Sequence, residues 1–217
     1  MKKYWTTAIA ATLLTAACST RNGHVTDTEE VKTVERLPGD SMVYGLACDG
    51  CNDTILVLLP LTGEDPDTFD ILDATTAGSV FGRPAIGDNV AIITNGEDRH
   101  VADLVVDIEQ LKGEWCYQLK TLEFGMEIKS EHIVRPIGMS QFRNSEKRDS
   151  MNIPPQKRYR EWNLLNGRLL LSETRRDTAG VTTTTNVDTA QFVLLQPDSL
   201  ILRFNDGTER NYYRSKR

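Results

Sequence analysis

Beyond residue 40, the hydrophobic residues fall into short runs separated by turn residues, which is the pattern of β-strands. The run at 54–59 is apolar on both faces, so it predicts a buried central strand. Asn95-Gly96 suits a hairpin turn, because both residues tolerate positive φ. The runs of this first block lie at 42–46, 54–59, 69–73, 89–94 and 101–108. Roughly five short strands in about 70 residues predict a small β-barrel over 41–110, and the OB-fold is the commonest such barrel.

A second block of strand-like runs follows and extends to the end of the chain, over 111–217. Asn166-Gly167 joins two of its runs as a hairpin. The runs lie at 115–119, 133–136, 139–143, 158–164, 168–172, 191–195, 199–204 and 209–213. No segment shows sustained helical periodicity, so we expect an all-β protein with two small antiparallel barrels.

The N-terminal 17 residues have the organisation of a signal peptide. Lys2 and Lys3 supply the positive charge, an uncharged apolar run follows, and small residues precede Cys18. The run is too short to span a bilayer, which takes about 20 apolar residues. The segment resembles the signal peptides of bacterial lipoproteins. This resemblance implies cleavage before Cys18, diacylglycerol on its sulfur and an acyl chain such as palmitate on its new amine.

Residues 18–40 are polar and lack periodicity, so they predict a flexible tether between the lipid and the first barrel. By resemblance to other lipoproteins, Ser19 after Cys18 favours the outer membrane, because an aspartate there holds many lipoproteins on the inner membrane. The next residues, 20–23, lack the acidic side chains that mark surface export in Bacteroidetes lipoproteins. We therefore expect the periplasmic face rather than the cell surface.

The charge of the chain argues against nucleic acid as a partner. Loss of the signal peptide removes two of the 25 basic residues and none of the 31 acidic ones, so 23 remain against 31 and the formal charge is −8. Nucleic acids and anionic lipid surfaces need a basic face. The three histidines are scattered, and no Gly-x-Ser-x-Gly or phosphate-binding glycine loop is present, so we expect no enzymatic activity.

The second block resembles the lipocalin-like domains of Bacteroidetes lipoproteins. The first matching motif is Leu111-Lys112-Gly113-Glu114-Trp115, which is similar to the "L-x-G-x-W" opening of that family. The other matching segments, in the family's order, are 150–153, 159–162, 167–172, 195–202 and 213–214. The resemblance implies a barrel with Trp115 and Trp162 in its interior, and a role in binding a small apolar ligand or a protein partner of the envelope. Lys157, Arg158 and Arg160 could meet an anionic ligand, but a solvated strand edge is the favoured interpretation.

Cys48-Asp49-Gly50-Cys51 is the main candidate for chemistry in the first block. An exported protein can keep a disulfide, so a structural Cys48–Cys51 bridge is the favoured interpretation. Two thiolates could instead bind Cu(I) or Zn²⁺, or act in redox sensing, or the two cysteines could remain a plain free pair. No second Cys-x-x-Cys or histidine pair completes a zinc site, so no cofactor is expected. Cys116 is expected to be a buried, unreactive thiol.

The position of this Cys-x-x-Cys near the start of the first barrel is similar to that in NlpE-type envelope lipoproteins. Those proteins combine a lipocalin-like barrel with an OB-like domain, in the opposite order, and are linked to surface sensing and copper stress. The resemblance implies an alternative function, a thiol- or metal-responsive envelope stress sensor that works through Cys48 and Cys51.

Overall fold

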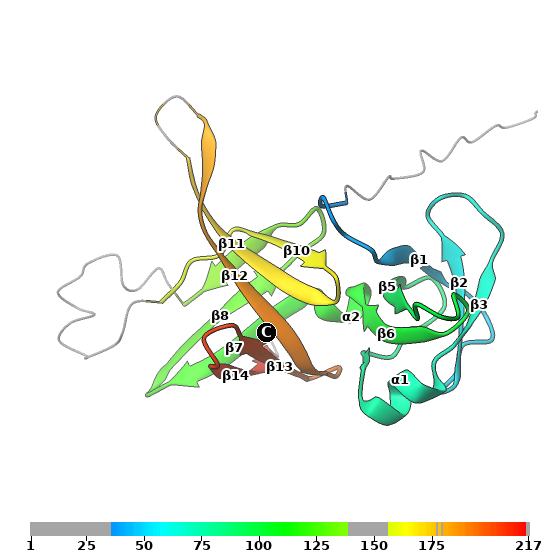
Figure 1. Ribbon diagram of the computed structural model, residues 1–217. Helices are drawn as coiled ribbons and strands as arrows, with labels where there is room; N and C mark the ends of the chain where they lie inside the picture. The colour runs from blue at the N-terminus through cyan, green and yellow to red at the C-terminus, as the bar shows by residue number, and fades with distance from the viewer. Residues whose placement is uncertain (1–35, 139–155, 177, 179, 216–217) are drawn as a thin grey trace, which may run out of the picture. The chain divides into compact units, whose positions relative to one another are not determined.

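The structure is a computed structural model that describes residues 36–138, 156–176, 178 and 180–215 (Figure 1). The predicted signal peptide, Cys18 and most of the tether lie outside these residues, as does the strand predicted at 139–143. Lys32–Arg217 forms one compact unit, which contains both blocks of strands. Neither helix in the described ranges has the length and hydrophobicity needed to cross a membrane.

The first block forms an N-terminal sheet, which in the described residues has six strands in the order β3-β2-β1-β5-β6-β4. Its elements are β1 (Val43–Ala47), β2 (Ile55–Pro60), β3 (Asp67–Asp70), α1 (Leu72–Ala77), β4 (Val80–Phe81), β5 (Asn89–Thr94) and β6 (Ala102–Asp107). A parallel bridge between Asp70 and Val101 brings the end of β3 to the start of β6. This order, with a helix after the third strand, is OB-like, as the sequence predicted.

The strand predicted at 69–73 is wrong in its second half, because the chain turns into α1 there. The Asp70 side chain accepts a hydrogen bond from the backbone N–H of Leu72 at 2.8 Å, which bends the chain out of β3. Gly78, with φ +70°, ends the helix in the left-handed conformation. Six residues are too few to show a helical period in the sequence.

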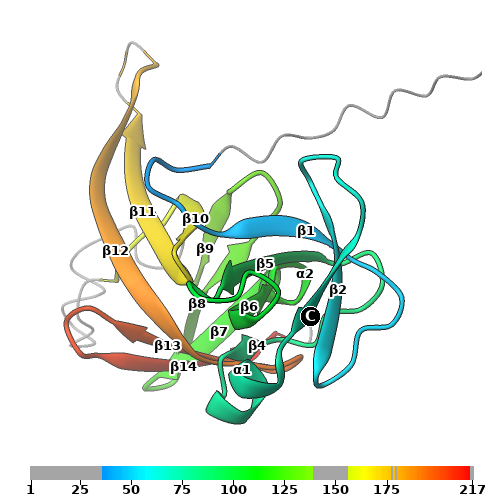
Figure 2. The same ribbon diagram turned by 45° about the vertical axis from the view of Figure 1, so that its right-hand side comes forward.

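The second block forms a C-terminal barrel of eight antiparallel strands among the described residues (Figures 1 and 2). A short helix, α2 (Ile108–Leu111), leads into it. The strands are β7 (Gly113–Leu119), β8 (Leu122–Ile128), β9 (Val134–Ile137), β10 (Glu161–Leu165), β11 (Arg168–Arg176), β12 (Thr182–Leu195), β13 (Ser199–Phe204) and β14 (Glu209–Arg214). Each strand pairs with the next strand in sequence except β9 with β10, and β14 pairs back with β7. This is the up-and-down order of an eight-stranded lipocalin barrel.

The barrel is nearly closed between β9 and β10. Ile133 and Glu161 form an antiparallel bridge there, and the N–H of Val134 donates to the carbonyl of Arg160 at 2.7 Å. The hairpin predicted at Asn166-Gly167 is confirmed, because both residues have positive φ between β10 and β11. Past the barrel, β11 and β12 continue as a two-stranded ribbon (Figure 2).

The sequence analysis missed β8, although apolar side chains alternate with Glu123, Gly125 and Glu127 along it. A Cβ at Gly125 would collide with the backbone of Trp115, so the glycine allows β8 to pair closely with β7.

The apolar interior of the barrel forms one continuous core with the outer face of the N-terminal sheet. Tyr44, Ala91 and Val106 of that sheet belong to the same buried cluster as Trp115 and Trp162. A second cluster of buried side chains, which includes Leu58 and Ile92, forms the core that the N-terminal sheet encloses.

Candidate functional site

The α2 end of the barrel is sealed around Trp115, which is completely buried. Its indole N–H donates to the carbonyl of Leu111 at 2.7 Å, and the Arg214 guanidinium stacks on its ring at 4.3 Å. Arg214 also donates to the carbonyls of Gln110, Lys112 and Pro197 at 2.6 to 2.9 Å. These contacts connect α2, β14 and the β12–β13 turn, which together close this end of the barrel.

The motif that ends at Trp115 needs a glycine at position 113. Its φ is +126°, which side chains rarely adopt, and a Cβ there would collide with Nη1 of Arg214. A glycine at this position lets Arg214 reach across β7 to the α2 carbonyls.

Trp162 lies in the wall of the barrel and is 4% exposed. Its indole N–H donates to the carbonyl of Lys129 at 2.8 Å, and the His132 ring packs on it with centroids 5.1 Å apart. Trp115 and Trp162 therefore both lie in the packed interior, and contact of either with a ligand stays a prediction.

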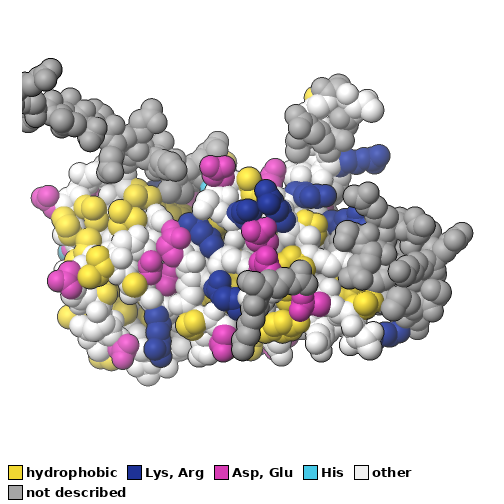
Figure 3. All heavy atoms as spheres, turned by 180° about the vertical axis from the view of Figure 1, so that it is seen from behind, with side chains coloured by type: hydrophobic (Ala, Val, Ile, Leu, Met, Phe, Trp, Pro, Cys, Tyr) yellow, Lys and Arg dark blue, Asp and Glu magenta, His cyan; other side chains and the backbone are white. Residues whose placement is uncertain are grey.

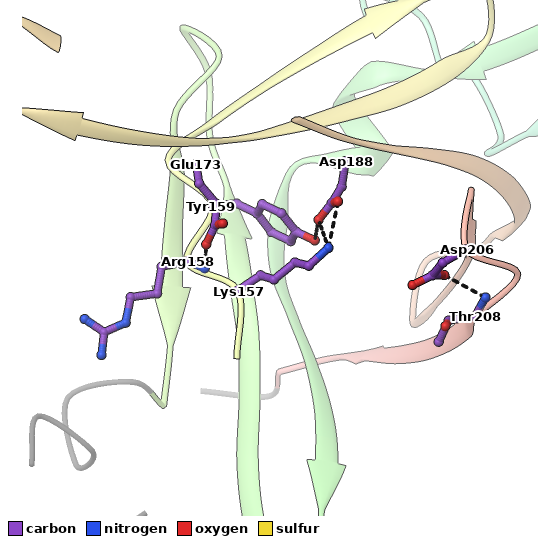
Figure 4. Close-up of polar contacts among 7 residues, drawn as sticks. All are labelled: Lys157, Arg158, Tyr159, Glu173, Asp188, Asp206 and Thr208. Carbon is purple, nitrogen blue, oxygen red and sulfur yellow. Dashed lines mark hydrogen bonds and ion pairs between the residues drawn. The ribbon is translucent and has the colours of Figure 1, made fainter. Parts of the chain in front are cut away.

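The opposite end of the barrel carries polar side chains, which we call the Asp188 cluster: Lys157, Tyr159, Asp188, Arg210 and Tyr212. Figure 4 shows the first three of them. Lys157 donates to both carboxylate oxygens of Asp188 at 2.6 and 2.7 Å. The buried Tyr159 hydroxyl donates to the same carboxylate at 2.5 Å. Burial and the neighbouring Asp188 charge raise the pKa of Tyr159, so it stays a neutral donor.

Arg210 enters this cluster from β14 and lies between two aromatic rings. Its guanidinium carbon is 4.7 Å from the Tyr117 ring centroid and 5.6 Å from that of Phe204. Arg210 also hydrogen-bonds the Tyr212 side chain, whose pKa burial raises to about 12 although Arg210 opposes the shift. Tyr117 is half-buried, whereas Trp115 at the α2 end is completely buried; Arg210 and Arg214 are both half-buried.

The rim around the cluster is held by side chains that cap backbone groups (Figure 4). Glu173 accepts from the N–H of Arg158 at 2.7 Å, and Asp206 accepts from the N–H of Thr208 at 2.9 Å. The hydrogen bonds from Thr208 lower the pKa of Asp206. Of the basic residues at 157–160, Arg158 and Arg160 are exposed, as the sequence suggested, whereas Lys157 is paired with Asp188.

Cys48 and Cys51 lie at the hairpin between β1 and β2, and both are free thiols in the structure. The Cys51 thiol donates to the carbonyl of Cys48 at 3.1 Å and accepts from the N–H of Val57 at 3.4 Å. The Cys48 thiol points to the carbonyl of Leu46 instead, at 3.7 Å. The disulfide expected from the sequence is therefore not formed in this structure, and it stays a prediction for the oxidised chain.

Within the described ranges, no group of three or more His, Cys, Asp or Glu side chains is arranged to hold a metal ion. Cys48 and Cys51 would supply two thiolates, and Zn²⁺ in structural sites takes four ligands. Cys116 follows Trp115 on β7 and is buried, as expected.

A pocket of about 360 Å³ lies outside the barrel, beside α2 and the β12–β13 turn. Gln110 accepts from the N–H of Arg83 there, and its buried amide nitrogen has no hydrogen-bond partner among the residues that the structure describes. The pocket is lined by Val80, Gly82, Arg83, Gln110, Leu194, Leu195, Gln196 and Pro197. No sequence motif marked these residues.

No model of a known protein family matches the chain. No curated protein matches it either. Among solved structures, a lipocalin-like protein from Bacteroides thetaiotaomicron VPI-5482 is similar. The two are 21% identical over 48% of this chain and 95% of the other, with a TM-score of 0.32.

Proposed function

We propose that this chain is a lipid-anchored, non-catalytic binding protein of the bacterial envelope, whose C-terminal barrel takes up a small ligand with an apolar body. The anchor rests on the signal-peptide pattern that ends at Cys18. We place the protein at the outer membrane, facing the periplasm, on the grounds of Ser19 and the residues after it. A Cys18→Ser variant should lose incorporation of a palmitate analogue and leave the membrane fraction.

The difference between the two ends of the barrel carries the binding proposal. On β7, Trp115 at the α2 end is completely buried, whereas Tyr117 at the Asp188 end is half-buried. Small eight-stranded barrels can hold one small ligand, and such sites combine apolar walls with a few placed polar groups. The packed tryptophans restrict a ligand to the Asp188 end.

Uptake of dodecanol by the purified chain from residue 19 to 217 tests this function. This fragment contains the whole compact unit, and native mass spectrometry with calorimetry would measure the binding. We expect one dodecanol per chain and a loss of affinity in Tyr117→Ala, with Tyr213→Ala on the outer face of β14 as the control. Absence of uptake of any aliphatic chain would exclude ligand binding and leave a protein partner as the function of the barrel.

The alternative function is a thiol-based envelope sensor, and the free state of Cys48 and Cys51 favours it. The hairpin that carries them lies next to Ile55 and Leu72, which are 38% and 50% exposed. Seen from behind, hydrophobic side chains gather over the N-terminal sheet (Figure 3). A change in this hairpin on oxidation or Cu(I) binding could thus reach a partner surface.

Alkylation of the same fragment with and without prior reduction, followed by mass spectrometry, distinguishes the two functions. Three alkylated thiols before reduction, or a bound metal in the native mass, would favour the sensor. A single alkylated thiol at Cys116 would establish the Cys48–Cys51 bridge and favour the binding protein. The Cys48→Ser, Cys51→Ser double variant should alter envelope stress responses only in the first case.

A further inference from the structure

The charges in the Asp188 cluster do not cancel. Lys157 and Asp188 form an ion pair at 2.6 Å, and the Asp188 side chain is 17% exposed. Arg210 lies in the same cluster but makes no ion pair with a carboxylate among the described residues. A guanidinium stays charged at all accessible pH values, so the five residues of the cluster carry one positive charge in excess, and the charges of Lys157 and Arg210 help to lower the pKa of Asp206 at the rim.

The contacts of Arg210 leave the edge of its guanidinium available. Tyr117 and Phe204 stack against it, and Tyr212 provides a hydrogen-bonding side chain. A guanidinium has five N–H donors in its plane, and the Tyr212 oxygen can satisfy only a minority of them. The remaining donors form the planar fork that binds a carboxylate through two parallel hydrogen bonds.

Arg203 lies on the opposite face of the same hairpin and is a surface arginine for comparison. It pairs with Glu209 of the neighbouring strand through Nε at 2.7 Å and is half exposed. Near Arg210, the carboxylate of Asp206 accepts a hydrogen bond from Thr208 and interacts with Arg210 only through their charges. Of the two arginines of this hairpin, the inward-facing one is therefore without an ion pair among the described residues.

We propose that Arg210 binds the carboxylate of an amphipathic ligand, whose apolar body lies against Tyr117, Phe204 and the apolar side chains below them. This assignment rests on the proposed function, since it gives the chemical class of the ligand that the barrel takes up. The ligand is an aliphatic or aromatic carboxylic acid in its ionised form. Tyr212 positions the guanidinium, and the Lys157–Asp188 pair stays intact.

Calorimetric titration of the chain from residue 19 to 217 with dodecanoate and with dodecanol, at neutral pH, tests the proposal. We expect dodecanoate to bind at least about tenfold more tightly than dodecanol, which corresponds to about 1.4 kcal/mol. Arg210→Gln should remove this preference while the affinity for dodecanol changes less than about twofold. Arg210→Lys should keep part of the preference, since it retains the charge but not the fork.

Arg203→Gln is the matched control, because it makes the same change in charge on the outer face of the hairpin. Thermal unfolding of each variant shows whether the barrel remains folded. Equal binding of dodecanoate and dodecanol, with no effect of Arg210→Gln, would overturn the proposal and leave the proposed function standing. Equal losses in Arg203→Gln and Arg210→Gln would also overturn it, since a surface potential would explain both. Binding of neither probe would overturn both the proposal and the proposed function.

Discussion

Arg210 and Arg214 are four residues apart on β14 and face the same way into the barrel. Each stacks on an aromatic side chain of β7, Tyr117 for Arg210 and Trp115 for Arg214. Arg214 also donates to three backbone carbonyls, whereas Arg210 has only the Tyr212 side chain as a polar partner in the described residues. The two arginines occupy equivalent positions on the strand, but their contacts differ. Arg214 therefore has a structural role, and Arg210 is the candidate for binding a ligand.

Replacement of the two arginines should separate these roles most strongly. Arg214→Gln removes charge-assisted hydrogen bonds to three carbonyls, and we expect the free energy of unfolding to fall by about 3 kcal/mol. Arg210→Gln should cost about 1 kcal/mol, which lies between the sizes of an exposed and a desolvated cation–π contact. Urea denaturation of both variants measures the difference. Similar losses at the two positions would contradict the division.

The glycine that makes room for Arg214 should come next in effect. Gly113→Ala places a Cβ against Nη1 of Arg214 at a φ of +126°, and we expect a loss of about 2–3 kcal/mol. In the Arg214→Gln background the collision is relieved and only the backbone strain remains. The double-mutant cycle should therefore show coupling between the two sites. Additive losses would mean that Gly113 serves its backbone conformation alone.

The sealed end was largely predictable from sequence, because its chemistry is local. The strand at Trp115 was predicted from its hydrophobic run, and the buried ring from the resemblance of the Leu111–Trp115 motif to the lipocalin-like opening. The OB-like barrel was predicted from short runs and turn residues, and the lipocalin-like barrel from the resemblance of the second block. The helix α1 was missed because it is a single short element that follows an aspartate turn.

The Asp188 cluster could not be predicted, because its members come from distant parts of the chain. Lys157 and Asp188 are 31 residues apart, and Arg210 joins them from another strand. The sequence did contain one usable signal, the alternation of Arg210, Tyr212 and Arg214 on one face of a strand. Which arginine lacks carbonyl partners depends on α2 and the β12–β13 turn, and only the folded structure shows this.

Asp107 helps to hold in place the backbone carbonyls of α2 that accept from Arg214. It accepts from the N–H of Gln110 at 2.9 Å and begins the helix that presents those carbonyls to Arg214. Burial raises the pKa of Asp107 to about 6, and the charge of Asp88 adds to the shift. The folded chain thus keeps a proton that the unfolded chain releases, so this stabilisation is full below about pH 4 and is lost as pH rises through 6.

Asp107→Asn keeps the acceptor for Gln110 and removes the titration. We expect it to be more stable than the parent chain above pH 6, by roughly 1–2 kcal/mol, with the difference fading toward pH 4. Urea denaturation across this pH range measures it. Asp88→Asn should move the parent profile to lower pH, since the Asp88 charge raises the pKa of Asp107. If the stability difference between Asp107→Asn and the parent chain did not depend on pH, the pKa of Asp107 would not be raised in the folded chain.

The smallest expected effect is that of Tyr159→Phe, which distinguishes the role of Tyr159 in the Asp188 cluster from that of Arg210. Tyr159→Phe removes one hydrogen bond to Asp188 and leaves the Lys157 pair in place, so we expect a loss of about 1 kcal/mol in the free energy of unfolding. The affinity for dodecanoate should stay within about twofold, because 0.4 kcal/mol or less is at stake when Arg210 is untouched. If Tyr159→Phe instead lowers that affinity as much as Arg210→Gln does, the carboxylate contacts the tyrosine, and Arg210 is not the group that distinguishes this end of the barrel from the other.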